Sequence, residues 1–305
     1  MNSKIGTMTS IVLLFFSTHV FATVYDVPPT NKSLIGDMQY GPVLVNDTLV
    51  TIAKRYNIGY NAILDANPQL YRGVLRTGAL LQIPTQHLLP PEAREGIVIN
   101  LPEMRMYYFP EGSNEVLTYP IGIGKIGKTI PIKRAVITRK TENPTWTPPE
   151  DIRKFNLDQG IVLPKVMPPG PDNPLGTYAI YMSIPTYLIH STIFPESVGK
   201  RASFGCIRMF ETDIESFFPS VKRGIPVVII NSPIKVAWQD DRLFMEAHDP
   251  LEEHTGVYEA SLPGAVHTIA STTKNQTMLI DWQLVSYIAK ERDGIPHEIG
   301  IKIYQ

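Results

Sequence analysis

Residues 187–209 read YLIHSTIFPESVGKRASFGCIRM, and this stretch carries the strongest signal in the chain. An apolar run ends at His190, and a glycine-containing loop leads to Cys206, the only cysteine in 305 residues. A strand, a loop and a second strand would bring the thiol back to the histidine. Because a single thiol forms neither an internal disulfide nor a multi-cysteine metal site, the pattern indicates a thiolate nucleophile activated by His190. The alternative is a buried cysteine that only fills apolar space.

The amino terminus predicts a secreted protein. Lys4 precedes an apolar run from Ile11 to Phe16, and Val20-Phe21-Ala22 is typical of a signal peptide cleavage site. We expect residues 1–22 to be removed, because the run is shorter than the roughly 18 residues of a membrane-spanning candidate. Free thiols tend to be oxidised outside the cytoplasm, so one retained cysteine favours a chemical role.

Composition favours a β-rich fold and argues against a nucleic-acid partner. The net charge is -1 and the pI about 6.7, which gives no basic footprint. The 27 prolines and 21 glycines lie among short apolar runs, which favours strands and turns over long helices. We therefore expect a sandwich or barrel over residues 95–231. The expected strands are 96–100, 104–109, 116–121, 135–138, 176–183, 187–190 and 226–230.

Two helices are expected in the second half of the chain. Thr212 or Asp213 should cap a helix over residues 214–218, which ends before Pro219. Residues 232–305 form an extension of mixed α and β structure. Within it we expect a helix at 282–292 and a last strand at 298–304.

Residues 34–86 form a small unit of their own, with the order strand, helix, helix, strand. Helices are expected at 49–56 and 60–67, and a closing strand at 80–83. With its Asp47-Thr48-Leu49 and Ala66-Asn67-Pro68 motifs, the unit resembles a LysM domain, which binds N-acetylglucosamine-containing glycans. A packing domain without a ligand is the alternative.

Two details of this unit lead to further expectations. Asn46 stands where the LysM family usually has glycine, and asparagine tolerates the same left-handed backbone. Residues 87–94 contain prolines and are expected to form a stiff linker that spaces the two domains without joining their cores.

Residues around the thiol supply the rest of a nucleophilic site. Gly205 lets the backbone approach a substrate carbonyl, and the amides of Phe204, Gly205 and Cys206 are candidates for an oxyanion hole. Ser191 can accept the second N–H of the histidine and so fix its tautomer. Arg208 carries a fork that suits a carboxylate, either on the substrate or on a structural acid.

Residues 96–231 resemble the YkuD-type L,D-transpeptidases of bacterial cell walls. That family is marked by Ile-His-Gly/Ser-Thr followed by Ser-x-Gly-Cys-Ile/Val-Arg, which match residues 189–192 and 203–208. Residues 144–149, 168–176, 213–214 and 224–227 match further family motifs. The preceding LysM unit and the segment 246–253 are similar to the periplasmic members of Gram-negative bacteria.

The resemblance implies a reaction and its partners. Cys206 would attack the diaminopimelate carbonyl of a tetrapeptide stem, release D-alanine and hold the stem as a thioester. An acceptor amine would resolve it, either on another stem, which gives a 3-3 cross-link, or on an outer-membrane protein. Carbapenems are expected to acylate the thiol. Many members have histidine in place of Phe204, so only its backbone amide is expected to act.

The implied site can be stated residue by residue. The predicted catalytic residues are Cys206, His190, Ser191 and Gly205, and the predicted substrate-binding residues are Arg208, Phe204, Ser203, Trp146 and Tyr187.

Other functions stay open. If water resolves the thioester on the same fold, the enzyme would be an L,D-carboxypeptidase or a hydrolase that releases anchored protein. If the second domain is catalytically inert, the chain would be a wall-binding structural protein that works through its LysM unit. No cofactor or metal is expected. Residues 122–128 lack the spacing of a phosphate-binding loop and should form a hairpin turn. A surface position, not a metal site, is expected for Glu246, His248, Asp249, Glu252, Glu253 and His254.

Overall fold

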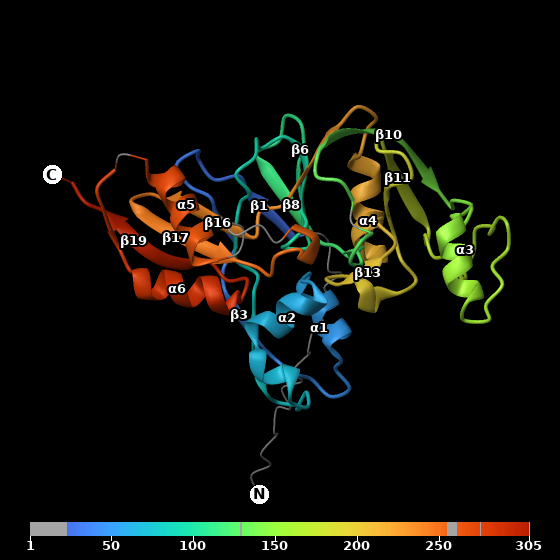
Figure 1. The fold of residues 1–305 in the computed structure, drawn as a ribbon, viewed down its shortest axis with the longest axis horizontal. Coiled ribbons are helices and arrows are strands. Elements are labelled where there is room, and N and C mark those ends of the chain that lie inside the picture. Colours follow the sequence, from blue (N-terminus) through green and yellow to red (C-terminus); the bar gives the residue numbers. More distant parts are fainter. Residues whose placement is uncertain (1–22, 129, 255–260, 275, 305) are drawn as a thin grey trace, which may run out of the picture.

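The computed structural model describes residues 23–128, 130–254, 261–274 and 276–304. The expected signal peptide, residues 1–22, lies outside them. Among the described residues, no helix is both long and apolar enough to cross a bilayer. A central sheet is flanked by the C-terminal extension on one side, with the small N-terminal unit below (Figure 1).

The central sheet has nine strands in the order β1-β8-β7-β6-β15-β10-β11-β12-β14. Most neighbours are antiparallel, but β15 pairs with β6, and β14 with β12, in parallel. The β-rich fold expected from the sequence is confirmed. The strands are β1 (Thr23–Asp26), β6 (Gly96–Asn100), β7 (Arg105–Phe109), β8 (Glu115–Pro120), β10 (Arg134–Glu142), β11 (Tyr178–Met182), β12 (Leu188–His190), β14 (Ile207–Arg208) and β15 (Pro226–Ile230).

Both faces of this sheet are covered, which explains the nearly continuous apolar sequence of its central strands. Ile97 and Ile99 of β6 enter the main core, whereas Val98 enters a second cluster on the opposite face. Beside the sheet, β9 (Ile123–Gly124) pairs in parallel with β13 (Arg201–Ser203). The chain turns after β9, where Lys128 N–H donates to the Lys125 carbonyl at 2.8 Å. A turn is therefore present, but the expected hairpin is not, because β9 pairs with β13 and not with the strand that follows the turn.

Helix α4 (Glu211–Phe217) packs on the main core and follows the thiol segment. It begins earlier than expected, with Phe210 at the N-cap and no side chain bonded there, so the expected cap by Thr212 or Asp213 is wrong. The Phe217 ring lies 5.2 Å from the Tyr108 ring, centroid to centroid. Tertiary packing of these aromatic rings therefore anchors the last turn of a helix whose start lacks a side-chain cap.

The N-terminal unit has the expected strand, helix, helix, strand order. Strand β3 (Gln39–Pro42) pairs with β4 (Leu80–Ile83), and η1 (Pro68–Tyr71) follows the second helix. Thr48 and Thr51 form a reciprocal capping box at α1 (Leu49–Tyr56), and α2 (Tyr60–Ala66) follows directly. Asn46 has a φ of 65°, which is the left-handed conformation expected at that position.

The expected separation of this unit from the sheet is wrong. Its core, which includes Ile52, Ile63 and Ile83, also contains Val198 and Phe210 from the thiol region. His87–Leu88, expected in a stiff linker, forms instead a buried strand, β5, that pairs with β2 (Leu34–Ile35). Residues 23–254 therefore do not divide into two independent hydrophobic cores.

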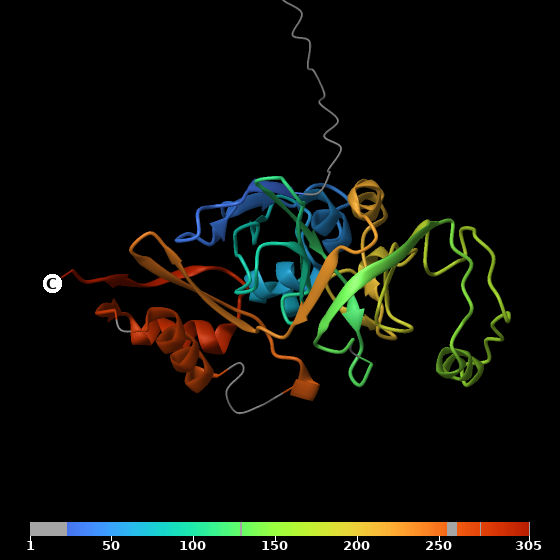
Figure 2. The same ribbon diagram turned by 90° about the horizontal axis from the view of Figure 1, so that it is seen from above.

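The extension is a second sheet with two helices on one face (Figure 2). The helix and last strand expected here are confirmed as α6 and β19. Residues from α5, α6 and the sheet share one core, with Ile269, Val285 and Leu243 buried together. The elements are β16 (Ile234–Gln239), β17 (Arg242–Ala247), α5 (Leu262–Thr273), β18 (Met278–Ile280), α6 (Trp282–Glu291) and β19 (His297–Lys302).

Residues 143–177 form an arm that projects from the opposite end of the molecule (Figure 1). The arm leaves β10 and returns to β11, and Asn143 N–H donates to the Thr177 carbonyl at 2.7 Å across its base. Trp146 and Met167 exchange two backbone hydrogen bonds, of 2.9 and 2.7 Å. The arm carries α3 (Glu150–Leu157), in which no residue is buried.

Candidate active site

An open groove of about 910 Å³ lies between the arm and the strands that carry the histidine and the thiol. It brings together seven of the nine predicted site residues. Gly205 lies within the thiol loop, and Ser191 is buried directly behind the groove. The lining includes Cys206, His190, Arg208, Phe204, Ser203, Trp146 and Tyr187.

The strand, loop and strand return is present, with the two strands parallel. Ile189 of β12 is level with Ile207 of β14, and His190 with Arg208. Met209 N–H also donates to the His190 carbonyl at 2.9 Å. Because Cys206 directly precedes β14, this register places the thiol and the imidazole at neighbouring strands and in one groove.

His190 is held as a neutral base. The ring is 4% exposed, and Nδ1 donates to the Ser191 carbonyl oxygen at 2.5 Å. Since a carbonyl only accepts, Nδ1 carries the proton and Nε2 keeps a lone pair. Burial, followed by the charge of Arg208, lowers the pKa of His190 to about 3. The imidazole is therefore uncharged at neutral pH.

Cys206 rests as a thiol. Burial raises the pKa of the Cys206 side chain. Its Sγ lies 3.7 Å from the Thr186 carbonyl oxygen, which accepts the thiol proton. Within the described residues no hydrogen bond joins Sγ to His190. The resting thiolate expected from the sequence is therefore not favoured, and proton transfer to His190 must accompany attack.

The oxyanion hole expected from three successive amides is reduced by Ser203. Gly205 N–H donates to Ser203 Oγ at 3.0 Å, and that hydroxyl donates to the Cys206 carbonyl at 2.6 Å. The Gly205 amide is therefore engaged within the loop. Gly205 itself is required, because its φ is 119° and an added Cβ would lie 2.6 Å from Tyr187 Cε1. The Phe204 and Cys206 amides remain as candidates.

Thr186 belongs to the site and was not predicted. It has a φ of 70°, which is a strained conformation for a β-branched residue. Tyr187 N–H donates to the Ile184 carbonyl at 3.3 Å, so Pro185 and Thr186 form the middle of a turn. Pro185 signals such a turn in the sequence, but nothing there shows that its carbonyl faces the sulfur.

Arg208 lines the groove without an ion-pair partner among the described residues. Its Cζ lies 5.7 Å from the centroid of the Phe194 ring, and its Nε is buried with no hydrogen-bond partner. Burial lowers the pKa of its guanidinium. The structural carboxylate weighed for Arg208 is not found, so its donors face a groove that can hold an acid.

The arm contacts the thiol loop through aromatic rings. Phe155 of α3 meets Phe204 edge to face at 5.3 Å. Lys125 Nζ lies 3.8 Å from the Phe204 centroid and 4.2 Å from that of Phe155. An exposed ion pair joins Lys128 Nζ to Asp151 Oδ2 at 2.6 Å. Phe204 thus binds the arm, in addition to offering a backbone amide.

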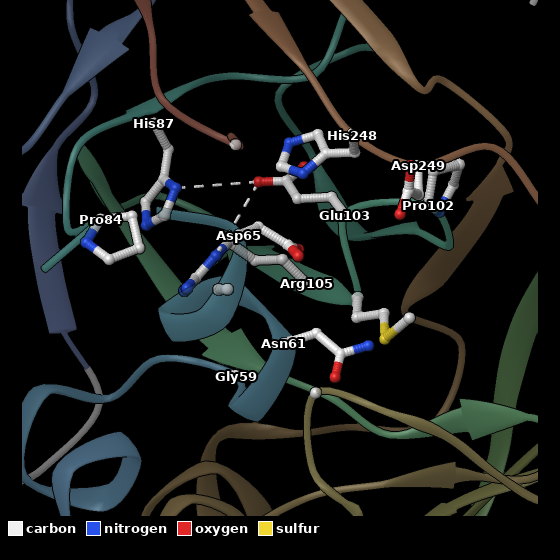
Figure 3. Close-up of a pocket in the computed structure, with 14 residues that line it drawn as sticks. Gly59, Asn61, Asp65, Pro84, His87, Pro102, Glu103, Arg105, His248 and Asp249 are labelled. Carbon is white, nitrogen blue, oxygen red and sulfur yellow. Dashed lines mark ion pairs between the residues drawn. The ribbon is translucent and has the colours of Figure 1, made fainter. Parts of the chain in front are cut away.

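A separate polar cluster lies where the N-terminal unit, the central sheet and the extension meet, and Figure 3 shows its members His87, Glu103, Arg105 and His248. It borders a cavity of about 50 Å³, away from the thiol. Lys235 Nζ lies 2.9 Å from Glu103 and 2.8 Å from Glu246, and His248 Nε2 lies 2.7 Å from Glu246. Leu88 N–H also donates to Glu246 at 2.6 Å.

The surface position expected for Glu246 is wrong, since this carboxylate is fully buried. His87, Glu103 and Glu246 point ligand atoms toward one another. The Lys235 ammonium, however, already lies between the two carboxylates, and Arg105 Nε lies 3.8 Å from Glu103, so two cations offset the two negative charges. The cluster therefore acts as an ion-pair network that joins three parts of the chain.

Comparison with known proteins agrees with this geometry. A model of the L,D-transpeptidase catalytic domain family YkuD matches residues 94–229, and a LysM domain model matches residues 43–84. Probable L,D-transpeptidase YcfS of Escherichia coli is 39% identical over 91% of this chain and 88% of its own length. Probable L,D-transpeptidases ErfK/SrfK and YbiS of the same organism are 39% and 34% identical, over 84% and 97% of this chain and 84% and 99% of theirs.

Proposed function

This chain belongs to the YkuD L,D-transpeptidases of peptidoglycan, and from that premise we propose that it transfers a stem peptide to an acceptor amine through a thioester on Cys206. The donor is a tetrapeptide stem cleaved after diaminopimelate. The observation that carries the proposal is a neutral His190, fixed by the Ser191 carbonyl, in the same groove as the only thiol.

The two half-reactions use one base. The sulfur attacks the diaminopimelate carbonyl while His190 Nε2 takes the thiol proton, and the amides of Cys206 and Phe204 stabilise the oxyanion. Collapse breaks the amide bond, and the imidazolium gives its proton to the leaving D-alanine amine. The acceptor amine then attacks the thioester, His190 takes its proton, and the sulfur leaves and is reprotonated.

Substrate binding divides between charge and shape. Arg208 would bind a stem carboxylate; its guanidinium lines the groove without a carboxylate partner in the described part of the chain, which supports this role. Trp146, Tyr187 and the Phe204 ring supply apolar walls, and Ser203 holds the thiol loop. The acceptor amine belongs to a second stem or to an outer-membrane protein.

We place this chemistry in the periplasm, on intact peptidoglycan. The amino-terminal sequence predicts export, and the close relatives come from Escherichia coli. The LysM domain would hold the glycan strand, with Asn46 serving the role of the usual glycine. Carbapenems would acylate Cys206, because their strained carbonyl reaches the same thiol and the same amides.

The test is product analysis on purified tetrapeptide muropeptides. Transfer gives dimers, whereas hydrolysis at the thioester gives tripeptides and would replace transferase with carboxypeptidase. Cys206→Ala should release no D-alanine, and His190→Ala should lose at least the ~10²-fold typical of a general base. D-Alanine release by Cys206→Ala at the wild-type rate would refute the proposal. Measuring the intact mass after carbapenem treatment, with peptide mapping to Cys206, tests the proposed acylation by carbapenems.

A further inference from the structure

The LysM domain rests directly on the segment that joins the histidine to the thiol. Tyr60 N–H at the start of α2 donates to the Val198 carbonyl at 3.1 Å, and Asn61 N–H donates to the Gly199 carbonyl at 3.2 Å. Val198 follows η2 (Pro195–Ser197) and is fully buried in the LysM core. These contacts therefore involve main chain as well as side chains.

Gly199 is held from two sides at this contact. Its N–H donates to the Ile121 carbonyl of the central domain at 3.1 Å. Its φ is 78°, and an added Cβ would lie 2.2 Å from Tyr60 N and 2.4 Å from Gly59 Cα. A Cβ on Gly59 would in turn lie 2.9 Å from Gly199 Cα. Only glycine on both sides permits backbones this close.

The LysM domain also holds the other side of the thiol loop. Phe210, four positions after Cys206 in the sequence, is 2% exposed and packs into the LysM core. Lys54 of α1 lies 5.8 Å from the centroid of its ring. Val198 and Phe210 are thus the two ends of a segment that contains the thiol, and both are anchored in the same core.

We propose that the LysM domain is a positioning element of the active site, which holds residues 198–210 in the shape that aims Cys206. This rests on the proposed function of Cys206 as nucleophile. It differs from glycan tethering, since a tether affects only substrates that carry glycan. We call the anchoring of Val198 and Phe210 in the LysM core the clamp. Because of the clamp, the LysM domain is necessary for the reaction of a free tetrapeptide as well. The clamp also couples any glycan bound to LysM to the thiol loop.

The test compares Gly199→Ala with Gly112→Ala in the full-length protein. Both glycines have a positive φ, of 78° and 75°, but a Cβ at Gly112 meets nothing within 4 Å. The two variants therefore share the backbone strain and differ in the LysM contact. On a glycan-free tetrapeptide, kcat per titrated thiol should fall at least tenfold in Gly199→Ala and less than twofold in Gly112→Ala, with the loss in kcat more than in KM.

Gly59→Ala is a milder variant, because the backbone of Gly59 suits alanine and only the contact with Gly199 is crowded. It should lower kcat in the same direction. Iodoacetamide labelling of Cys206 should also change in rate at least threefold in Gly199→Ala. Wild-type kcat and labelling in folded Gly199→Ala and Gly59→Ala would overturn the inference. If the wild type releases no D-alanine, the proposed function fails, while labelling still tests the clamp.

Discussion

Two regions touch the thiol loop, and they are attached in opposite ways. The LysM domain shares a core with Val198 and Phe210, both almost fully buried. The arm of residues 143–177 contacts Phe204 through Phe155, and the exposed Lys128–Asp151 pair joins the arm to the turn after β9. No residue of α3 is buried. The LysM domain is therefore fixed to the central sheet, whereas the arm is held only by surface contacts.

The difference follows from what each contact removes from water. Residues that share one apolar core become exposed to water only when most of the fold unfolds. An edge-to-face ring pair and a surface ion pair, by contrast, together contribute only about 1–2 kcal/mol to holding the arm in place. We expect the arm to separate from the loop in a local step and the LysM domain to unfold with the central sheet. The predictions below test that contrast.

The largest effect should come from Lys235→Met at the junction. The change leaves Glu103 and Glu246 buried together without their shared cation, which should cost about 3–5 kcal/mol of unfolding free energy. Chemical denaturation measures it. The control is Arg242→Met, whose ion pair with Glu298 is exposed and should cost less than about 1 kcal/mol. Equal losses in the two variants would mean that the junction network does not hold the domains together.

A middle-sized effect is expected at the arm. Phe155→Ala removes the ring contact with Phe204 and the contact with Lys125. The fraction of molecules in which the arm rests on the thiol loop should therefore fall, and kcat/KM for the donor stem should fall with it by about tenfold. Global stability should change by less than about 1 kcal/mol. Leu157→Ala on the same helix is the control, because its side chain is exposed and does not line the groove. A loss of global stability as large as that of Lys235→Met would contradict the local opening.

The smallest effects are pH-dependent and have opposite signs in the two regions. Burial raises the pKa of Asp65 in α2 to about 6 from an unperturbed value of 3.8. The folded protein thus keeps a proton that the unfolded chain has lost, so this residue lowers stability as the pH rises from about 4 to 6. Asp65→Asn should gain about 1 kcal/mol at pH 7.5 and nothing at pH 4, the partial exposure of the side chain limiting the gain.

Asp151 on the arm behaves in the opposite way. Its hydrogen bond with Lys128 lowers the pKa of the carboxyl below 3.8, so the contribution is present above that pH and is lost as the pH falls through the lowered value. Asp151→Asn should cost a few tenths of a kcal/mol at pH 7.5. Thermal unfolding at several pH values compares the two variants with the wild type. A change in stability of the same sign in both variants at pH 7.5 would show that Asp65 does not lie in a buried site that favours its protonated form.

The sequence predicted the parts that depend on local pattern. The helices at 49–56 and 60–66, strand β6 and the presence of His190 and Cys206 in one groove follow from apolar spacing and from motifs. The sequence did not predict the hydrogen bonds of the site that depend on tertiary contacts. Ser203 Oγ takes the Gly205 amide, and the Thr186 carbonyl takes the thiol proton, because the fold brings backbone groups together that no motif marks.

The packing of the three parts of the chain against one another was the larger error of the sequence prediction. Prolines in residues 87–94 indicated a stiff linker that spaces two separate domains, but His87 and Leu88 are buried in a strand pair against β2. The ion pair of Lys235 with Glu103 and the hydrogen bond from Leu88 N–H to Glu246 join residues that lie far apart in the sequence. Local propensity carries no information on such contacts, and a buried carboxylate in a polar stretch looks like a surface residue.

Amide hydrogen exchange of the intact protein, resolved by NMR, tests the central claim most directly, since it measures both regions at once. The amides of Tyr60, Asn61 and Gly199 should exchange with those of β6 and β7, at the rate set by global unfolding. Those of α3, residues 150–157, should exchange orders of magnitude faster. Exchange of Tyr60 and Asn61 as fast as α3 would contradict a LysM domain built into the catalytic scaffold.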